Sequence, residues 1–264
     1  MCGRYAASRS AEDLVEELEV GSIDTTGAAA VPAEGLRASY NVAPTDSVPA
    51  VLQRPLSKGE ESVRRLVCLR WGLVPSWAKS PSIGNRMINA RAETVADKPA
   101  FKRAFAARRC LLPADGYYEW YPTSQRSRNG KPVKQPFFIH PSDGGVLAMA
   151  GLYEIWRDPA KDRDDPSAWL WTSTVLTTTA EDAVGHVHDR MPLLVEPDRW
   201  RAWLNPAEAD RDRLIELLVP AAPGRLEAYP VSTEVNNVRN DGARLIDPLP
   251  AEQVPSEPAT LDVT

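Results

Sequence analysis

Short apolar runs, separated by Gly, Pro, Ser or Asn, recur along most of the chain. Runs of this length that are rich in Val, Leu, Trp and Tyr predict β-strands. The predicted strands cover residues 47–53, 62–72, 108–112, 116–121, 136–140, 145–157, 168–178 and 226–231. So many short strands in one chain indicate a barrel or a sandwich.

A smaller set of segments has apolar residues at helical spacing. Ser10 followed three residues later by Asp13 resembles a helix start, and Leu14 and Leu18 then fall on one face. The predicted helices cover residues 11–19, 97–107, 196–204 and 207–218. We expect these helices to cover the edges of the sheets, which makes the predicted fold class a strand-rich α+β domain.

Two segments interrupt this pattern. Residues 123–135 are polar and basic and predict a flexible hairpin loop, whereas residues 247–264 are acidic and rich in Pro and predict a disordered tail. The remaining residues 1–246 are expected to form a single domain, because 264 residues with 43% hydrophobic content suit one large core. Apolar runs are too short for a membrane helix and the amino terminus lacks a secretory pattern, so we expect a cytoplasmic protein without membrane contact.

The overall net charge of −5 conceals an uneven distribution. Residues 62–160 hold 16 basic and 7 acidic side chains, while residues 1–61 hold 5 and 10, and residues 161–264 hold 10 and 19. A basic central third is compatible with an anionic ligand, although neighbours in sequence need not be neighbours in space.

The three cysteines are an odd number without C-x-x-C spacing, which argues against a disulfide framework and predicts free thiols at Cys2, Cys68 and Cys110. Cys2 becomes the first residue if Met1 is removed, and its amine and thiol then form a 1,2-aminothiol. An α-amino group has a pKa near 7.7–8.0, so about a tenth is neutral at pH 7 and able to attack an aldehyde. The thiol can then close a five-membered thiazolidine ring. The alternative is an ordinary buried thiol near the chain terminus.

Seven ordered motifs resemble the SRAP (SOS-response-associated peptidase) family, also called abasic-site processing proteins, over about residues 1–248. The motifs are MCGRY (1–5), YNVAPT (40–45), RWGLVPSW (70–77), NARAET (89–94), DGYYEW (115–120), HDRMP (188–192) and VRNDG (238–242). The resemblance implies an open β-barrel with peripheral helices that presents the cysteine in a groove for single-stranded DNA. It also implies removal of Met1 and a thiazolidine crosslink to the ring-opened sugar of an abasic site.

The resemblance also implies roles for single residues. The implied catalytic residues are Cys2, Asn89, Glu119 and His188. The implied DNA-binding residues are Arg4, Asn41, Pro44, Trp71, Arg91, Trp120, Thr177 and Arg190. Arg4, Arg91 and Arg190 are the expected phosphate contacts, and three such contacts predict that log affinity falls with log salt at a slope near −2.

The spacing of the motif residues supports part of this assignment directly. Asn89 and Arg91 face the same way on an extended segment, so their amide and guanidinium can serve one ligand; the alternative is a capped turn in which Glu93 pairs locally. Glu119 stands in an alternating apolar run, where burial raises a carboxyl pKa and favours proton transfer. Its alternative is a surface residue on an edge strand.

His188 stands two residues before Arg190, and an imidazole is suited to proton transfer near pH 7. His186 adds a second imidazole, but no third ligand follows at a recognisable spacing, so we expect neither a metal nor another cofactor. Trp120 offers either a stacking face for DNA or a core side chain.

Three classes of function remain open at this point. The first is an enzyme that bonds covalently to abasic sites in single-stranded DNA, acting as a monomer. The second is a cysteine peptidase that acts on other proteins with Cys2, Glu119 and His188, although no pattern suggests an oxyanion hole. The third is a non-covalent single-strand-binding module, for which Cys2 would be dispensable.

Overall fold

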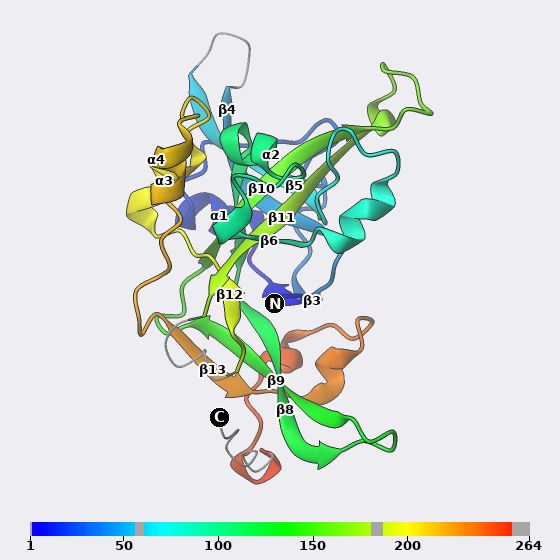
Figure 1. Ribbon diagram of the computed structural model, residues 1–264, viewed down its shortest axis with the longest axis vertical. Coiled ribbons are helices and arrows are strands. Elements are labelled where there is room, and N and C mark those ends of the chain that lie inside the picture. The colour runs from blue at the N-terminus through cyan, green and yellow to red at the C-terminus, as the bar shows by residue number, and fades with distance from the viewer. Residues whose placement is uncertain (1, 56–60, 181–186, 255–264) are drawn as a thin grey trace.

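The computed structural model describes residues 2–55, 61–180 and 187–254 (Figure 1). Its strands are β1 (Tyr5–Ala7), β2 (Ser22–Ile23), β3 (Ser39–Val42), β4 (Ser47–Pro55), β5 (Ser62–Trp71), β6 (Asn89–Arg91), β7 (Arg109–Ala114), β8 (Gly116–Arg126), β9 (Pro132–Pro141), β10 (Leu147–Arg157), β11 (Trp169–Thr179), β12 (Arg190–Pro192) and β13 (Leu226–Pro230). Its α-helices are α1 (Ala11–Glu17), α2 (Lys102–Ala107), α3 (Pro197–Leu204) and α4 (Arg211–Glu216).

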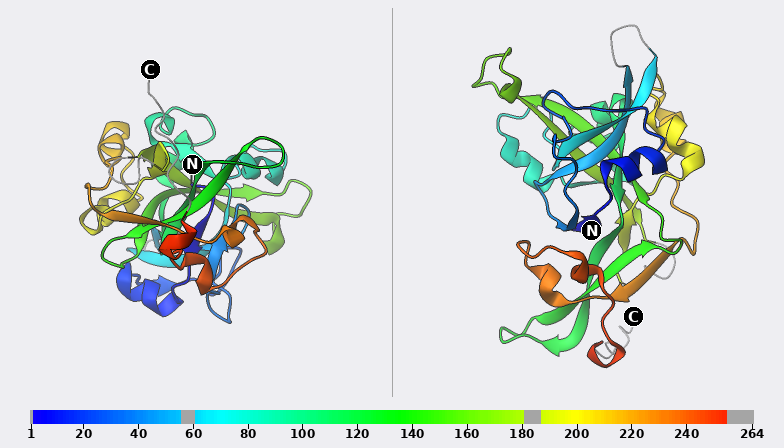
Figure 2. Two further views of the ribbon diagram at one scale, coloured as in Figure 1. Left: turned by 90° about the horizontal axis from the view of Figure 1, so that it is seen from below. Right: turned by 180° about the vertical axis from the view of Figure 1, so that it is seen from behind.

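The strands form two sheets. The large sheet has the order β12-β11-β10-β7-β4-β5-β2, with β6 paired in parallel to β11, and the small sheet has the order β13-β9-β8-β1-β3. In Figures 1 and 2 the small sheet lies below the large one, and the first described residues of the chain lie where the two sheets meet. This confirms the strand-rich α+β fold with peripheral helices.

Both faces of the large sheet are buried, which explains why its strands read as nearly continuous apolar runs. On β4, Ala50 and Leu52 belong to the core between the sheets, while Val51 belongs to the core beneath the helices. On β7, Cys110 likewise belongs to the core between the sheets and Leu111 to the core beneath the helices. Because successive side chains of a strand point to opposite faces, one apolar run serves both cores.

The helices are short and pack on the outer face of the large sheet. The capping box at the start of α1 is formed as predicted: the Ser10 hydroxyl accepts from the Asp13 amide, and the Asp13 carboxylate accepts from the Ser10 amide, both at 3.1 Å. Trp203 of α3 is completely buried and donates its indole N–H to the Cys110 carbonyl at 2.9 Å, which ties this helix to β7.

All eight predicted strands and all four predicted helices are present, with shifted ends. Helix α2 begins at Lys102, later than the predicted start at residue 97. The pattern missed strands β1, β2, β3, β6 and β12, each of which spans four residues or fewer. Runs this short carry too few side chains for periodicity to distinguish them from loops.

The predicted hairpin over residues 123–135 is present, but its loop is shorter than expected. Strand β8 extends to Arg126 and β9 begins at Pro132, so most of this polar segment is a two-stranded hairpin. Solvent-exposed hairpin strands need no apolar alternation, which is why the pattern did not reveal them.

The predicted tail begins too early at residue 247. Leu249 donates its amide to the Pro230 carbonyl at 2.9 Å, Pro248 bridges to Val231, and Ala251–Gln253 form a 3-10 turn. Residues 255–264 of the predicted tail lie outside the described residues. No helix in the described ranges is long and apolar enough to cross a membrane.

Candidate active site

Cys2 lies at the junction of the two sheets and leads directly into β1. Its side chain is completely buried, and its thiol donates to the Arg4 carbonyl at 3.9 Å. Burial raises the pKa of the Cys2 thiol well above its usual range, and the negative charge of Glu119 raises it further. The thiol is therefore neutral at physiological pH in this environment.

Asn89 fixes the backbone of Cys2. Its side-chain Nδ2 donates to the Cys2 carbonyl at 2.7 Å, and its Oδ1 is buried and has no hydrogen-bond partner among the described residues. Asn89 opens β6, which runs parallel to β11 with Asn89 opposite Val175 and Arg91 opposite Thr177. The extended segment predicted for Asn89 and Arg91 is thus confirmed, and the capped turn is excluded.

Glu119 of the small sheet also lies near Cys2. Strand β8 lies between β9 and β1, so Glu119 is not on an edge strand, and its side chain is buried. Burial raises the pKa of its carboxyl, while a protonated His188 opposes that shift. The Oε2 atom of Glu119 lies 4.0 Å from Nε2 of His188, which brings these two predicted catalytic residues together.

His188 faces two competing partners at Nδ1. The Arg190 backbone N–H lies 2.9 Å from Nδ1 and can donate only when Nδ1 carries no proton. The Asp189 carboxylate lies 2.8 Å from the same atom and accepts only when Nδ1 is protonated. Nδ1 of His188 therefore has a hydrogen-bond partner both with and without a proton on that atom, so either tautomer of the ring can be held in place.

Arg190 is held by the carboxylate of Glu93 and by the backbone of β11. It makes two hydrogen bonds to Glu93, at 2.5 and 3.0 Å, and a third to the Thr177 carbonyl at 2.6 Å. These hydrogen bonds lower the pKa of Glu93. Glu93 therefore pairs with Arg190 of β12, and the alternative in which Glu93 pairs within its own motif is excluded. No local pattern predicts this pair, because the two residues are far apart along the chain.

Arg4, Asn41 and Trp120 form a second group on the small sheet. Arg4 donates to the Asn41 side chain at 2.7 Å and to the Val235 carbonyl at 2.9 Å, and its guanidinium lies 5.9 Å from the Trp120 ring centre. Asn41 is buried and also donates to three backbone carbonyls, those of Val235, Asn237 and Asn240. Trp120 is partly exposed and donates to Asn236 at 2.6 Å.

Three of the expected DNA contacts are buried in this structure. Trp71 is completely buried, donates to the Ile88 carbonyl and packs edge-on against Tyr5; Thr177 is also completely buried. Both contact other side chains or backbone groups of the protein, as the buried Asn41 does. The exposed aromatic of the same motif is Trp77, which is 57% exposed. A run of two tryptophans in one motif could not show which of them faces solvent.

Arg91 and Pro44 remain accessible as predicted. Arg91 is exposed and makes no hydrogen bond or ion pair with a described residue, while Pro44 is partly exposed beside Thr45, which has a left-handed φ of 82°. A hollow of about 420 Å³ adjoins this region and is lined by Arg37, Asn41 and Arg239 among others.

Two residues near Cys2 were not predicted. The hydroxyl groups of Tyr5 and Tyr117 are buried without a hydrogen-bond partner among the described residues, and Cys2 raises the pKa of both beyond the effect of burial. Tyr117 stands two residues before Glu119 on β8, so the alternation of the strand could have placed both on one face.

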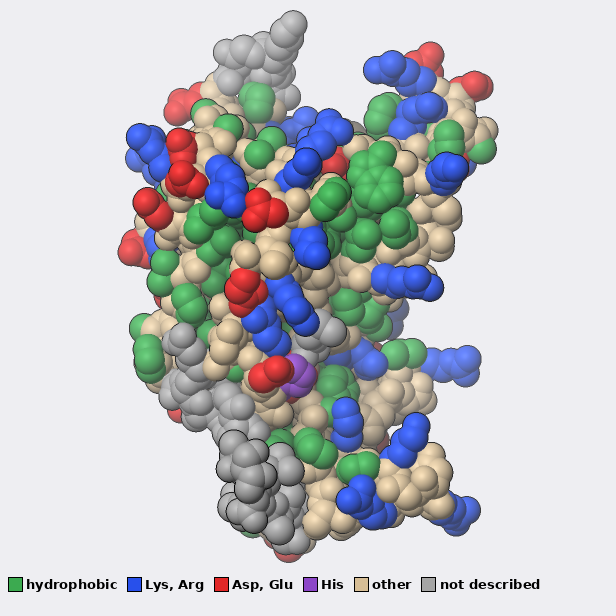
Figure 3. Space-filling model, viewed as in Figure 1, with side chains coloured by type: hydrophobic (Ala, Val, Ile, Leu, Met, Phe, Trp, Pro, Cys, Tyr) green, Lys and Arg blue, Asp and Glu red, His purple; other side chains and the backbone are tan. Residues whose placement is uncertain are grey.

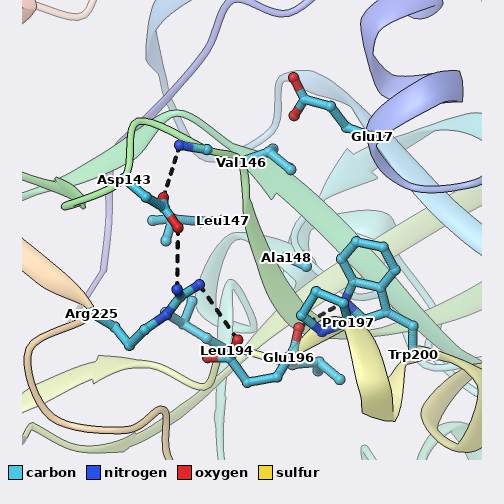
Figure 4. Close-up of a pocket in the computed structure, with 12 residues that line it drawn as sticks. Glu17, Asp143, Val146, Leu147, Ala148, Leu194, Glu196, Pro197, Trp200 and Arg225 are labelled. Atoms are coloured by element: carbon cyan, nitrogen blue, oxygen red, sulfur yellow. Dashed lines mark hydrogen bonds and ion pairs between the residues drawn. The ribbon is translucent and has the colours of Figure 1, made fainter.

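Within residues 2–55, 61–180 and 187–254 there is no group of three or more His, Cys, Asp or Glu arranged to hold a metal. His186, the other imidazole weighed as a ligand, lies outside the described residues. A separate pocket of about 270 Å³ is lined by apolar residues such as Leu194 and Trp200 and by Arg225, which bridges Asp143 and Glu196 (Figure 4). It contains none of the predicted site residues.

Known proteins resemble this chain over most of its length. The family model "SOS response associated peptidase (SRAP)" matches residues 1–238, and the chain belongs to the SRAP family. The abasic site processing protein YoaM of Bacillus subtilis is 37% identical over 94% of this chain and 98% of its own length. YedK of Escherichia coli and HMCES of Gallus gallus, which carry the same description, are 32% and 33% identical, each over 94% of this chain.

Solved structures confirm the fold. A protein from Bacteroides thetaiotaomicron, 21% identical, aligns with a TM-score of 0.72 over 94% of this chain and 100% of its own. A phage-related protein from Bordetella bronchiseptica, 30% identical, aligns with a TM-score of 0.61 over 87% of this chain and 94% of its own.

Proposed function

We propose that this protein bonds covalently, through Cys2, to abasic sites in single-stranded DNA. The free α-amine of Cys2 attacks the aldehyde carbon of the ring-opened sugar, and loss of one water gives an imine. The thiol sulfur then attacks the imine carbon, and its proton passes to the nitrogen. The product is a thiazolidine whose ring contains the nitrogen, Cα, Cβ and sulfur of Cys2 together with the former aldehyde carbon.

This chemistry requires that the Met1–Cys2 peptide bond be hydrolysed first. Water adds across the bond, which releases methionine and frees the amine of Cys2. The neutral state of the buried thiol supports an order in which the amine, not the sulfur, makes the first attack. Self-removal of Met1 also accounts for the word peptidase in the family description without requiring another protein as substrate.

The observation that carries the proposal is the 2.7 Å hydrogen bond from Asn89 to the Cys2 carbonyl, made where the Glu119 carboxyl raises the thiol pKa. The bond holds the terminal residue in one orientation, as a reaction that uses both its amine and its thiol requires. The unpartnered Oδ1 of Asn89 is available to accept from the freed amine. An ordinary core cysteine has no need of such an arrangement.

Glu119 and His188 are assigned the proton transfers. A carboxyl whose pKa is raised by burial can protonate the sugar ring oxygen as the ring opens and the carbinolamine hydroxyl as water leaves. His188, 4.0 Å away and partly exposed, can exchange that proton with solvent.

The DNA strand is held through its phosphates, because an abasic nucleotide has no base edge to read. Arg91 is exposed for this purpose, Arg4 lies beside the aromatic face of Trp120, and Arg190 lies on the same side of the site as Asn89 through its contact with Thr177. Trp77 offers an exposed ring for stacking with a neighbouring base.

Intact-mass analysis tests the proposal. The purified protein should lack the mass of Met1, and incubation with a single-stranded oligonucleotide that carries one abasic site should add the oligonucleotide mass less one water. The same oligonucleotide with an intact base should add nothing. Retention of Met1, or no mass gain with the lesion, would refute the proposed chemistry.

A further inference from the structure

The end of the β8–β9 hairpin concentrates unpaired positive charge. Arg126, Arg128, Lys131 and Lys134 are all exposed, and their side chains make no hydrogen bond or ion pair with a residue that the structure describes. Residues 120–142 contain no Asp or Glu. Figure 3 shows Lys and Arg side chains on the projection at its lower right, which corresponds to this hairpin in Figure 1.

Several cations elsewhere on the surface are paired with carboxylates, unlike the four in the hairpin. Examples are Arg64 with Glu19 at 2.6 Å, Arg211 with Asp97 at 3.0 Å and Arg225 with Asp143 at 3.1 Å. A paired cation has its charge largely neutralised, whereas unpaired cations free of nearby acids attract a polyanion. The hairpin end is therefore suited to bind phosphates.

Hydrogen bonds hold the hairpin in a defined shape. The Thr123 hydroxyl donates to the Val133 carbonyl at 2.9 Å, and the Ser127 amide donates to the Lys131 carbonyl at 2.8 Å. Gly130 closes the turn with a left-handed φ of 78°, which favours glycine. The four charged residues therefore lie on a hydrogen-bonded hairpin end, residues 123–134, which we call the arm.

The arm is a direct continuation of the candidate active site. Strand β8 carries Glu119 and Trp120 and runs on to Arg126. Seven residues at about 3.3 Å each place Arg126 roughly 23 Å from Glu119 along the strand. Because phosphates of one strand are about 3.4 Å apart along a duplex axis, this reach corresponds to at most roughly seven nucleotides.

We propose that the β8–β9 hairpin is a second DNA-binding surface, which binds backbone phosphates several nucleotides away from the nucleotide that reacts with Cys2. This inference rests on the proposed function, since that function brings the strand past Glu119. The arm reads no sequence and contributes electrostatic affinity. Its contribution therefore depends on the length of the DNA and on salt.

The test compares two charge-matched double variants with the unmodified protein. Arg126→Gln/Arg128→Gln removes two cations from the hairpin, and Arg103→Gln/Arg201→Gln removes two exposed cations from α2 and α3, away from the hairpin, that form no ion pair with a described residue. Equilibrium binding is measured with lesion-free single strands of about three and about thirty nucleotides, because of these two only the longer strand can lie at the active site and also reach the hairpin. A third series uses a lesion-free duplex of the longer length. Adduct yield with abasic DNA is measured separately by intact mass.

With the long single strand, the hairpin variant should bind more weakly, and the salt slope of log affinity should decrease in magnitude by about 1.4, or about 0.7 for each lost contact. The advantage of the unmodified protein should therefore shrink about sevenfold between about 50 and about 200 mM salt. The short strand should bind equally well to all three proteins, and Lys131→Gln/Lys134→Gln should repeat the length-dependent loss. A larger loss on the duplex than on the single strand would identify duplex phosphates as the ligand of the arm.

Equal affinity of the hairpin and control variants for both long DNAs would overturn the second surface, as would an equal loss on the short strand. The adduct yield decides the proposed function independently. If the adduct forms but the hairpin variant shows no length-dependent loss of affinity, the proposed function is retained and the second surface is rejected. If affinity is lost in that way but no adduct forms, the second surface is retained and the covalent chemistry is rejected.

Discussion

The two sheets contribute different chemistry to the candidate active site. The small sheet supplies Glu119 from β8 and, through β1, the short segment that begins at Cys2. The large sheet supplies Asn89 from β6 and Arg190 from β12, both docked on β11. The buried carboxyl and the candidate nucleophile thus come from one layer, and most of the groups proposed to orient the chain terminus and bind phosphate come from the other.

This difference in chemistry between the two sheets follows from how deeply the site residues of each sheet are buried. Glu119 is enclosed against the inter-sheet core and its pKa is raised, as acid catalysis requires. On the large sheet, β6 and β12 flank β11 near its end, where Arg91 stays exposed and Arg190 stays partly exposed for an anion. His188, which lies between Arg190 and Glu119, connects the two layers.

Substitution of Cys2 should have the largest effect, because both bonds to the sugar form at this residue. Cys2→Ala should abolish the durable adduct, while Cys2→Ser should keep the amine and form only an imine that borohydride traps. Cys68→Ser, which removes a different partly buried thiol, is the control and should crosslink normally. A full yield of stable adduct from Cys2→Ala, measured by intact mass, would contradict the assigned nucleophile.

Glu119→Gln should next separate the roles of the two sheets. Loss of a general acid or base typically slows a reaction by about 10²–10⁴-fold, so the crosslinking rate should fall by this order with little change in DNA affinity. Glu154→Gln is the matched control, because Glu154 is also a buried carboxylate but lies on β10 of the large sheet, paired with Arg108 at 2.7 Å. Single-turnover rates that fall equally in both variants would dismiss the acid–base role.

The two tryptophans of the RWGLVPSW motif should respond in opposite ways. Trp71→Ala should lower the free energy of unfolding by about 3–5 kcal/mol, since it empties a fully buried site. Trp77→Ala should leave stability unchanged and weaken single-strand binding by about 1–3 kcal/mol if its ring stacks on a base. Chemical denaturation and equilibrium binding of both variants check this. A stability loss with Trp77→Ala would place that ring in the core.

Arg190→Ala and Arg91→Ala test the anchoring layer. Each should weaken DNA binding and reduce the magnitude of the salt slope by about 0.7, while the crosslinking rate at saturating DNA stays near that of the unmodified protein. Glu93→Gln keeps a hydrogen-bond acceptor for Arg190 but removes the negative charge, so it should strengthen binding slightly. If the crosslinking rate at saturating DNA falls as much as in Glu119→Gln, the division between a proton-transfer sheet and a DNA-anchoring sheet is wrong.

The smallest expected effect is on the pH dependence of stability. Because the folded pKa of Glu119 is raised above its ordinary value of 4.5, the folded protein holds this proton more tightly than the unfolded chain. The stabilising contribution is complete below that ordinary value and is lost as pH rises through the folded pKa. Denaturation across this range should show that Glu119→Gln gains stability relative to the unmodified protein as pH increases. A constant difference would contradict the raised pKa.

Residues with strong local patterns could be predicted, and residues defined by distant contacts could not. The long strands and the capped helix at Ser10 follow from patterns that neighbouring residues share. The pairing of Arg190 with Glu93 and the burial of Trp71 depend on strands brought together from separate parts of the chain. The three short strands β1, β6 and β12, which build much of the site, exist because longer strands provide their hydrogen-bond partners.

The sequence alone therefore determined the family, the strand-rich fold and the candidate nucleophile, because these depend on residue types and their order. The tertiary structure decided which of the motif residues are exposed and which are enclosed: it buried Trp71, Thr177 and Asn41 and left Trp77 exposed. It also brought Glu119 and His188 to within 4.0 Å. The physical reason is that burial and pairwise electrostatics depend on distances in space, which a linear pattern does not contain.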